Sequence, residues 1–130
     1  MRIYLDSSAA VKRYVSEPDH ELVLDACRDA QAWLANRIAF VEVRNALARS
    51  QAATQRFRRE WPQYDIVELD AEIADRASSI ATSDGLRSLD AIHLASAERA
   101  GRKKLVFATW DRRLWNAASK RGFEMLPEKL

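Results

Sequence analysis

Four acidic residues in this chain stand where their carboxylates could work together. Asp6 directly follows the apolar run RIYL, and Asp111 comes three residues after the apolar run LVFA. Asp90 opens a helical stretch, SLDAIHLASA, and Glu42 lies inside another, IAFVEVRNAL. If the two apolar runs are parallel strands, their carboxyl ends meet at one edge of a sheet, where α/β proteins place their working sites. The four carboxylates are therefore candidates for a single crevice.

Glu42 is the least ordinary of the four, because it lies too deep in its helix to cap it. Ile38 and Asn45 lie four and three positions away, and Val41 is the adjacent residue, so we expect apolar and amide neighbours around it. Burying an unpaired carboxylate is costly or forces it to take up a proton. Glu42 must therefore reach solvent, pair with an arginine such as Arg44, or face a bound cation.

The three aspartates each have a simpler interpretation at a helix terminus. Asp6 can cap a helix that begins near Ser7, and Asp111 can cap its own helix. Asp90 comes just after a capping Ser88, where the helix dipole favours negative charge. For each residue alone, this interpretation stays open.

Four converging carboxylates, in contrast, indicate a cation. They would repel one another and raise one another's pKa values unless a positive charge neutralised them. Oxygen ligands without histidine or thiolate suit Mg²⁺ or Mn²⁺. Metal ions held on carboxylates can activate water and stabilise the leaving oxygen of a phosphodiester. The four acids together predict metal-assisted phosphodiester hydrolysis, with the metal as the positive partner of Glu42.

The composition narrows the class of protein. With 130 residues and a net charge of +2, we expect one domain, residues 1–130, with a weak overall field. Cys27 is the only cysteine, which excludes an internal disulfide, and we expect His93 to pack and make one hydrogen bond. The three glycines of the chain are too few and too far apart to form a phosphate-binding loop.

The expected location follows from what the sequence lacks. Without a signal segment or an apolar run of about 20 residues, we expect a cytoplasmic protein that does not span a membrane.

Apolar runs alternate with helical stretches along the chain. We expect strands at 2–5, 32–35, 66–69 and 105–108, with an edge strand at 123–126. We expect helices at 7–15, 19–29, 37–51, 54–61, 71–81, 88–100 and 111–121. This alternation predicts a three-layer α/β/α domain around a parallel sheet.

Four segments, in order, resemble the PIN-domain nucleases, and most closely the VapC-type toxins of prokaryotic toxin–antitoxin pairs. They are YLDSSAAVKRYVSEP, RIAFVEVRNALAR, LRSLDAIHLASAERAG and LVFATWDRRL. The third is the most specific, because DAIHLA-type helices that carry the third acid are typical of that family. The resemblance implies a sheet in the order 3-2-1-4-5 and a Mg²⁺-dependent endoribonuclease in which Mn²⁺ can substitute.

The resemblance also implies roles for individual residues. Asp6 and Asp90 would be the main metal ligands, and Asp111 would complete the site or hold a second ion. Glu42 would bind metal through water or orient the nucleophile, and Thr109 would hydrogen-bond an acid or a water. The sequence departs from many relatives at Ala39, where they carry serine, which leaves the hydrogen bonding of Glu42 without that hydroxyl.

Partners follow from the same resemblance. The implied substrate is RNA, of the transfer or ribosomal class, and the implied regulator is a VapB-type antitoxin whose tail covers the active-site groove. A homodimer is implied, with DNA contacted only through the antitoxin. Basic side chains would hold RNA phosphates; the candidates are Arg13, Arg112 and Arg113, and the run Arg56, Arg58 and Arg59.

Two other functions remain open. A receiver-like signalling domain also gathers acids at strand ends, but it needs an acidic pair after the first strand and a late lysine. Here Asp6 is followed by Ser7 and Ser8. A catalytically inactive, RNA-binding relative of the PIN nucleases would keep the fold without the chemistry.

Overall fold

A central sheet of five parallel strands organises the protein. The computed structural model describes residues 1–130, and the sheet has the order β3-β2-β1-β4-β5. The strands are β1 (Arg2–Leu5), β2 (Ala32–Asn36), β3 (Asp65–Val67), β4 (Leu105–Ala108) and β5 (Glu124–Leu126). Every adjacent pair is parallel. The predicted class and strand order are confirmed, and β3 is shorter at its carboxyl end than expected.

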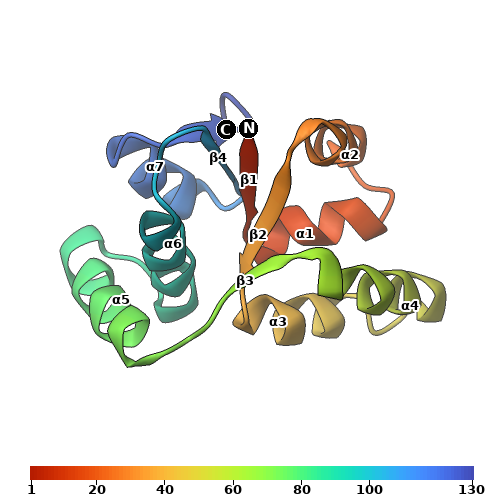
Figure 1. The fold of residues 1–130 in the computed structure, drawn as a ribbon, viewed down its shortest axis with the longest axis horizontal. Helices are drawn as coiled ribbons and strands as arrows, with labels where there is room; N and C mark the ends of the chain where they lie inside the picture. The colour runs from red at the N-terminus through yellow and green to blue at the C-terminus, as the bar shows by residue number, and fades with distance from the viewer.

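Helices cover both faces of this sheet (Figure 1). They are α1 (Ser7–Tyr14), α2 (His20–Asp29), α3 (Ile38–Ala46), α4 (Gln51–Glu60), α5 (Ala71–Asp84), α6 (Ser88–Ala100) and α7 (Arg112–Lys120), with a 3₁₀ turn η1 (Trp61–Gln63) after α4. Helices α1 to α4 lie on one side of the sheet, and α5 to α7 lie on the other. None of the helices combines the length and apolar character needed to cross a membrane.

Each face of the sheet has its own apolar core, and β1 contributes to both. Ile3 and Leu5 pack with the α1–α4 side, whereas Tyr4 between them packs with the α5–α7 side. Alternate side chains of a strand point to opposite faces, so a strand covered on both sides reads as a continuous apolar run. This double burial makes β1 the rigid centre of the sheet, and its carboxyl end leads directly to Asp6.

Two predicted helix boundaries are wrong. The break expected between the helices at 37–51 and 54–61 comes earlier, because α3 ends at Ala46 and Ser50 caps α4 by accepting a hydrogen bond from the Ala53 amide at 3.2 Å. The expected cap Ser88 is the first helical residue, and Arg87 precedes it without a side-chain capping bond. Helical periodicity runs on through such breaks, so the sequence does not mark them clearly.

Candidate metal-binding and catalytic site

The site begins where the two central strands end. Leu5 of β1 lies beside Ala108 of β4, so the residues that follow them, Asp6 and Thr109, are neighbours in space. The Thr109 hydroxyl donates to Asp6 Oδ2 at 2.5 Å. Asp6 Oδ1 accepts from the Ser8 hydroxyl at 2.7 Å and from the Ala9 amide at 2.8 Å. Asp6 therefore caps α1, as the simpler interpretation holds, and also presents a fixed carboxylate at the sheet edge.

Burial makes the charge of Asp6 costly. The residue is only 3% exposed. Burial raises the pKa of its carboxyl above the usual value, although His93 and the bonds from Thr109 and Ser8 act in the opposite direction. A carboxylate that is buried, fixed and short of positive charge is favourable for a cation.

Glu42 has a protein partner that the sequence did not reveal. Its Oε1 lies 2.9 Å from His93 Nε2 and accepts from the Ser7 hydroxyl at 2.5 Å. Burial would raise the pKa of Glu42, but the bonds from His93 and Ser7 outweigh it and lower the pKa. Ser7 and His93 thus provide the hydrogen bonds that Ala39 cannot, and Glu42 remains ionised at neutral pH.

His93 is held by a chain of hydrogen bonds from the protein interior. Its Nδ1 lies 2.8 Å from the Tyr4 hydroxyl, and the Asn36 amide donates to that hydroxyl oxygen at 3.2 Å. Burial raises the pKa of Tyr4 far above its usual value, so the hydroxyl keeps its proton. On the other side of the ring, Nε2 lies 2.9 Å from Glu42 Oε1 and 3.4 Å from the Ser7 hydroxyl. His93 therefore has three hydrogen-bond partners, Tyr4, Glu42 and Ser7, where one was expected.

The predicted neighbours of Glu42 are wrong in one respect. The adjacent Val41 is 71% exposed, and Asn45, three positions after Glu42, is also exposed, so neither residue packs Glu42 into an apolar contact. The buried residues of α3 are Ala39 and Val43. They are four positions apart on the side that packs against α1, which turns Glu42 to the rim of the sheet edge and leaves it half-buried.

Asp90 and Asp111 share a single arginine. Arg87 Nε lies 3.1 Å from Asp90 Oδ2, and its Nη2 lies 2.7 Å from Asp111 Oδ2. Burial and the nearby charge of Asp111 raise the pKa of Asp90, while Arg87 lowers it. Asp111 also caps α7 by accepting from the Leu114 amide at 3.0 Å. The two carboxylates are therefore close enough to repel, with Arg87 as their counter-ion.

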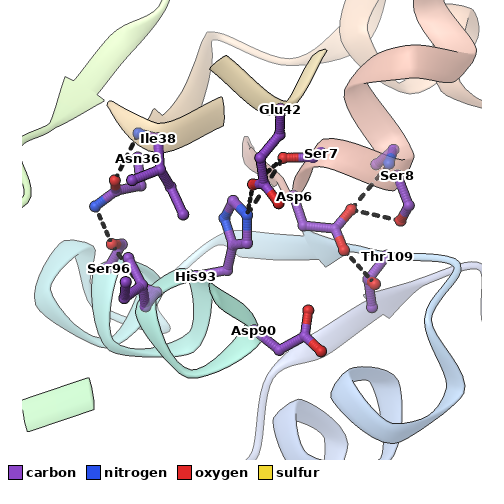
Figure 2. Close-up of polar contacts among 12 residues, drawn as sticks. Asp6, Ser7, Ser8, Asn36, Ile38, Glu42, Asp90, His93, Ser96 and Thr109 are labelled. Carbon is purple, nitrogen blue, oxygen red and sulfur yellow. Dashed lines mark hydrogen bonds and ion pairs between the residues drawn. The ribbon is translucent and has the colours of Figure 1, made fainter. Parts of the chain in front are cut away.

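The helices and strands bring the predicted acids to one region of the molecule, but the carboxylates do not surround a common position. Figure 2 shows Asp6, Glu42 and Asp90 reaching this region from the β1–α1 junction, α3 and α6. As they lie, no three of the Asp, Glu, His and Cys side chains form a group that could hold a metal ion. The donor chemistry fits a hard divalent cation, because the candidate ligands are carboxylate oxygens. Binding one would require Arg87 to release its two aspartates.

The candidate RNA contacts are differently placed. Arg13 bonds Glu60 through Nε at 2.8 Å and lies over the Trp33 ring, so it would have to leave this pair to hold a phosphate. Arg112 and Arg113 are exposed near the start of α7 and make no ion pair. In the α4 run, the Arg56 guanidinium donates to a backbone carbonyl, and Arg58 and Arg59 are exposed.

Comparison with known proteins agrees with this arrangement. Residues 3–120 match the PIN domain family. The chain belongs to the PIN-domain family. It is of the VapC type: it is 36% identical to Ribonuclease VapC45 of Mycobacterium tuberculosis (strain CDC 1551 / Oshkosh), over 98% of this chain and 96% of that protein.

Solved structures share the fold of this PIN domain. PAE2754 from Pyrobaculum aerophilum superposes with a TM-score of 0.72 at 19% identity, covering 97% of this chain and 89% of that one. A toxin–antitoxin complex from Klebsiella pneumoniae gives a TM-score of 0.68 at 20% identity, covering 84% and 85%. A receiver-like domain, in contrast, has the strand order 2-1-3-4-5. The observed order of 3-2-1-4-5 argues against that alternative.

Sequence reasoning named the candidate acids but missed several residues that hydrogen-bond them. Ser7, Ser8, Arg87 and His93 all bond a candidate acid. Arg87 stands three positions before Asp90, a helical spacing at which opposite charges meet, so that pair could have been found. The link from His93 to Glu42 joins α6 to α3, and nothing in the local sequence indicates it.

Proposed function

We propose that this PIN domain is a Mg²⁺-dependent endoribonuclease that acts as the toxin of a toxin–antitoxin pair. The observation that carries the proposal is that Asp6, Glu42 and Asp90 reach one region of the molecule (Figure 2), with Asp111 linked to Asp90 through Arg87, in a chain similar to proteins named Ribonuclease VapC. The charges of Asp6 and Asp90 are costly as they lie, and a divalent cation would neutralise them.

The residues support this role as follows. Asp6 and Asp90 would hold Mg²⁺, or Mn²⁺ in its place, and Asp111 would complete the set. The bound ion would supply an activated water and neutralise charge on the phosphodiester. Thr109 and Ser8 fix both oxygens of Asp6.

Glu42 would orient the attacking water. Ser7 and His93 bond only its Oε1, which leaves Oε2 to accept a proton from that water. Because the pKa of Glu42 is lowered, Oε2 is ionised and ready as an acceptor at neutral pH.

The proposal includes partners. The substrate would be an RNA of the transfer or ribosomal class, and a VapB-type antitoxin would cover the site. The similar fold of the Klebsiella toxin–antitoxin complex supports this pairing. The chain would work in the cytoplasm as a homodimer and meet DNA only through the antitoxin.

Cleavage of labelled RNA by the purified protein tests the activity. We expect cleavage with Mg²⁺ or Mn²⁺ and none with EDTA. Asp90→Asn should slow it at least about a hundredfold, the scale of losing one essential catalytic group. The matched control is Asp75→Asn, an exposed acid on α5 without a hydrogen-bonded partner, which should cleave like the parent protein.

Equal cleavage by the Asp90→Asn variant and the parent protein would contradict the assignment. If the parent protein binds RNA but cleaves none under any metal, the inactive RNA-binding function is correct instead. Growth arrest on expression, lost in Asp90→Asn and kept in Asp75→Asn at equal protein levels, tests the toxin role separately.

A further inference from the structure

A polar cavity of about 600 Å³ lies between the end of α5 and one face of α7. Its α7 wall carries Arg113, Asn116 and Lys120, at positions three, four and seven residues apart, which fall on one side of a helix. Ala117 is its only apolar lining residue. A cavity with such walls fits a polar ligand and not an apolar one.

The charge in this cavity is positive because only part of it is compensated. Arg121 bonds both oxygens of Asp84, at 2.9 and 2.8 Å, and also bonds Glu98 at 3.0 Å. That arginine is therefore neutralised within the protein. Arg113 and Lys120 make no hydrogen bond or ion pair with any residue, and both are exposed. Two uncompensated cations on one helix face attract an anion.

Both walls of the cavity lie close in the chain to residues of the candidate catalytic site. Asp111 caps α7, so the helix that carries Arg113 and Lys120 starts at one of the site's acids. Gly85 of the opposite wall is two residues from Arg87, which bonds Asp111 at 2.7 Å. From Asp111 to Lys120 the helix advances about 13 Å, at about 1.5 Å per residue. A polymer held at the acids would pass directly onto this face.

We propose that this groove, formed by Arg113, Asn116 and Lys120 of α7 and by Gly85 after α5, binds the RNA phosphate backbone on one side of the cleavage position. The inference rests on the proposed function and adds to it the path of the strand. The two cations hold phosphates, and the Asn116 amide donates to phosphate or sugar oxygens. An acidic protein segment would also be attracted, but α7 begins at Asp111, one of the candidate acids, which favours the substrate strand.

RNA binding measured without catalysis tests the groove. The probe is a fluorescein-labelled single-stranded RNA of mixed sequence, titrated with protein in EDTA and followed by fluorescence anisotropy. The test variant is Arg113→Ala/Lys120→Ala, two exposed helix positions where alanine keeps the helix. The matched control is Lys103→Ala/Lys129→Ala, which removes two positive charges, as the test variant does. Each double variant therefore takes the net charge from +2 to 0. Both control lysines are exposed, and Lys103 precedes β4, away from the carboxyl ends of the strands.

We expect the test variant to bind RNA at least about tenfold more weakly and the control to stay within about twofold of the parent protein. The slope of log K against log salt should fall by about 1.4 in the test variant, because each phosphate contact to a single strand contributes about 0.7. Circular dichroism of both variants establishes that α7 is kept.

Equal effects of the two double variants, or no effect of either, would overturn the proposal. A polyglutamate peptide is titrated in parallel: loss of its binding with unchanged RNA binding would make the groove a protein contact and also overturn it. Failure here is distinct from failure of the proposed function. A parent protein that cleaves RNA, with a test variant that binds normally, refutes only the groove, whereas groove-dependent binding without cleavage refutes only the nuclease.

Discussion

Asp6 shows at the scale of a single residue how a helix cap and a candidate metal ligand coincide. An ionised carboxylate has about four lone-pair sites, and Asp6 uses three of them for Ser8, Ala9 and Thr109. These bonds fix its orientation without supplying a full positive charge. The capping and functional interpretations of the sequence are thus compatible, because the cap provides the rigidity that a ligand needs.

Replacing Asp6 by Asn should stabilise the metal-free protein at neutral pH. Burial raises the folded-state pKa of this carboxyl above the unfolded value of 3.8, so ionisation costs stability once the pH exceeds about 3.8. Asp6→Asn removes that cost, with a gain on the order of 1 kcal/mol, the scale of one buried hydrogen-bonding change. The gain should be present at pH 7 and should vanish at pH 3, where Asp6 is protonated.

Urea unfolding in EDTA at the two pH values measures this difference. Asp75→Asn, an exposed acid-to-amide change, is the control and should leave the free energy of unfolding unchanged at both. A less stable Asp6→Asn protein at pH 7 would show that its bonds outweigh the cost of burial.

Arg87 should compete with a divalent ion for the carboxylates that it bridges. Its guanidinium is 70% exposed and bonds both Asp90 and Asp111, so metal binding there must break two exposed contacts. Arg87→Gln should therefore bind Mn²⁺ about twofold to fivefold more tightly, since such pairs are worth roughly 0.2–1 kcal/mol. Isothermal titration measures this, with Arg76→Gln, which loses an ion pair to Glu98, as the control. Weaker binding to Arg87→Gln would mean that Arg87 positions the acids instead of blocking them.

The sequence predicted which acids come together but not what holds them. Asp6 and Asp111 were placed by the strands that precede them, a local relation. The bonds from His93 to Glu42 and to Tyr4 join residues 51 and 89 positions apart. Such contacts depend on how α6 docks on the sheet, and no pattern within a segment encodes that docking.

At the scale of elements, α1 and α4 are joined by a partly buried polar cluster around Glu60. Arg13 and the Tyr14 hydroxyl both donate to Glu60 Oε1, at 2.8 and 2.7 Å, and Tyr14 also bonds Tyr64. Burial opposes the charge of Glu60, but the bonds from Arg13 and Tyr14 hold its pKa below the usual value. The cluster anchors α4, the helix whose start was predicted three residues too late.

Glu60→Gln should destabilise the protein at neutral pH. A carboxyl whose folded-state pKa is lowered contributes stability above the unfolded value of about 4.5 and loses it as the pH falls through the folded pKa. We expect a loss of about 1–2 kcal/mol at pH 7, the scale of a hydrogen bond to a charged group. The difference from the parent protein should shrink below pH 4.

Urea denaturation at pH 7 and pH 3.5 checks this dependence. Glu68→Gln, which breaks a fully exposed pair with Arg37, is the control and should change little. Equal losses from Glu60→Gln at the two pH values would mean that packing, and not charge, carries the effect.

Element boundaries were predictable only where a side chain marks them. Asp111 caps α7 and Gly101 ends α6, as expected. The break between α3 and α4 was predicted about five residues too late, because the apolar spacing that places Ala39, Val43 and Leu47 in the core continues to Ala53 of α4. Its cause is the Ser50 cap, and a single serine within a helical pattern is a weak signal.

For the whole molecule, the candidate site depends on the sheet holding distant parts of the chain together. Asp6 and Thr109, 103 positions apart, are bonded only because β1 and β4 are adjacent. Alternating apolar runs predicted the parallel sheet, but the order of its strands came from the family resemblance. Strand order depends on which helices pack across each face, and two cores of similar size leave several orders possible from periodicity alone.

Metal binding should therefore stabilise the entire fold and not one loop. The candidate ligands come from the β1–α1 junction, α6 and the start of α7, so unfolding any of these elements would release the ion. An ion present at about one hundred times its Kd adds about 2.7 kcal/mol, which for 130 residues raises Tm by roughly 10 °C. Differential scanning calorimetry with Mg²⁺, Mn²⁺ or EDTA measures the shift. The Asp90→Asn variant should lose most of it, because Asp90 lies in the same region as Asp6 and Glu42 (Figure 2), whereas Asp75→Asn changes only an exposed acid on α5 and should keep it. The same shift in all three proteins would place the ion elsewhere on the surface, and no shift in the parent protein would show that these carboxylates hold no metal.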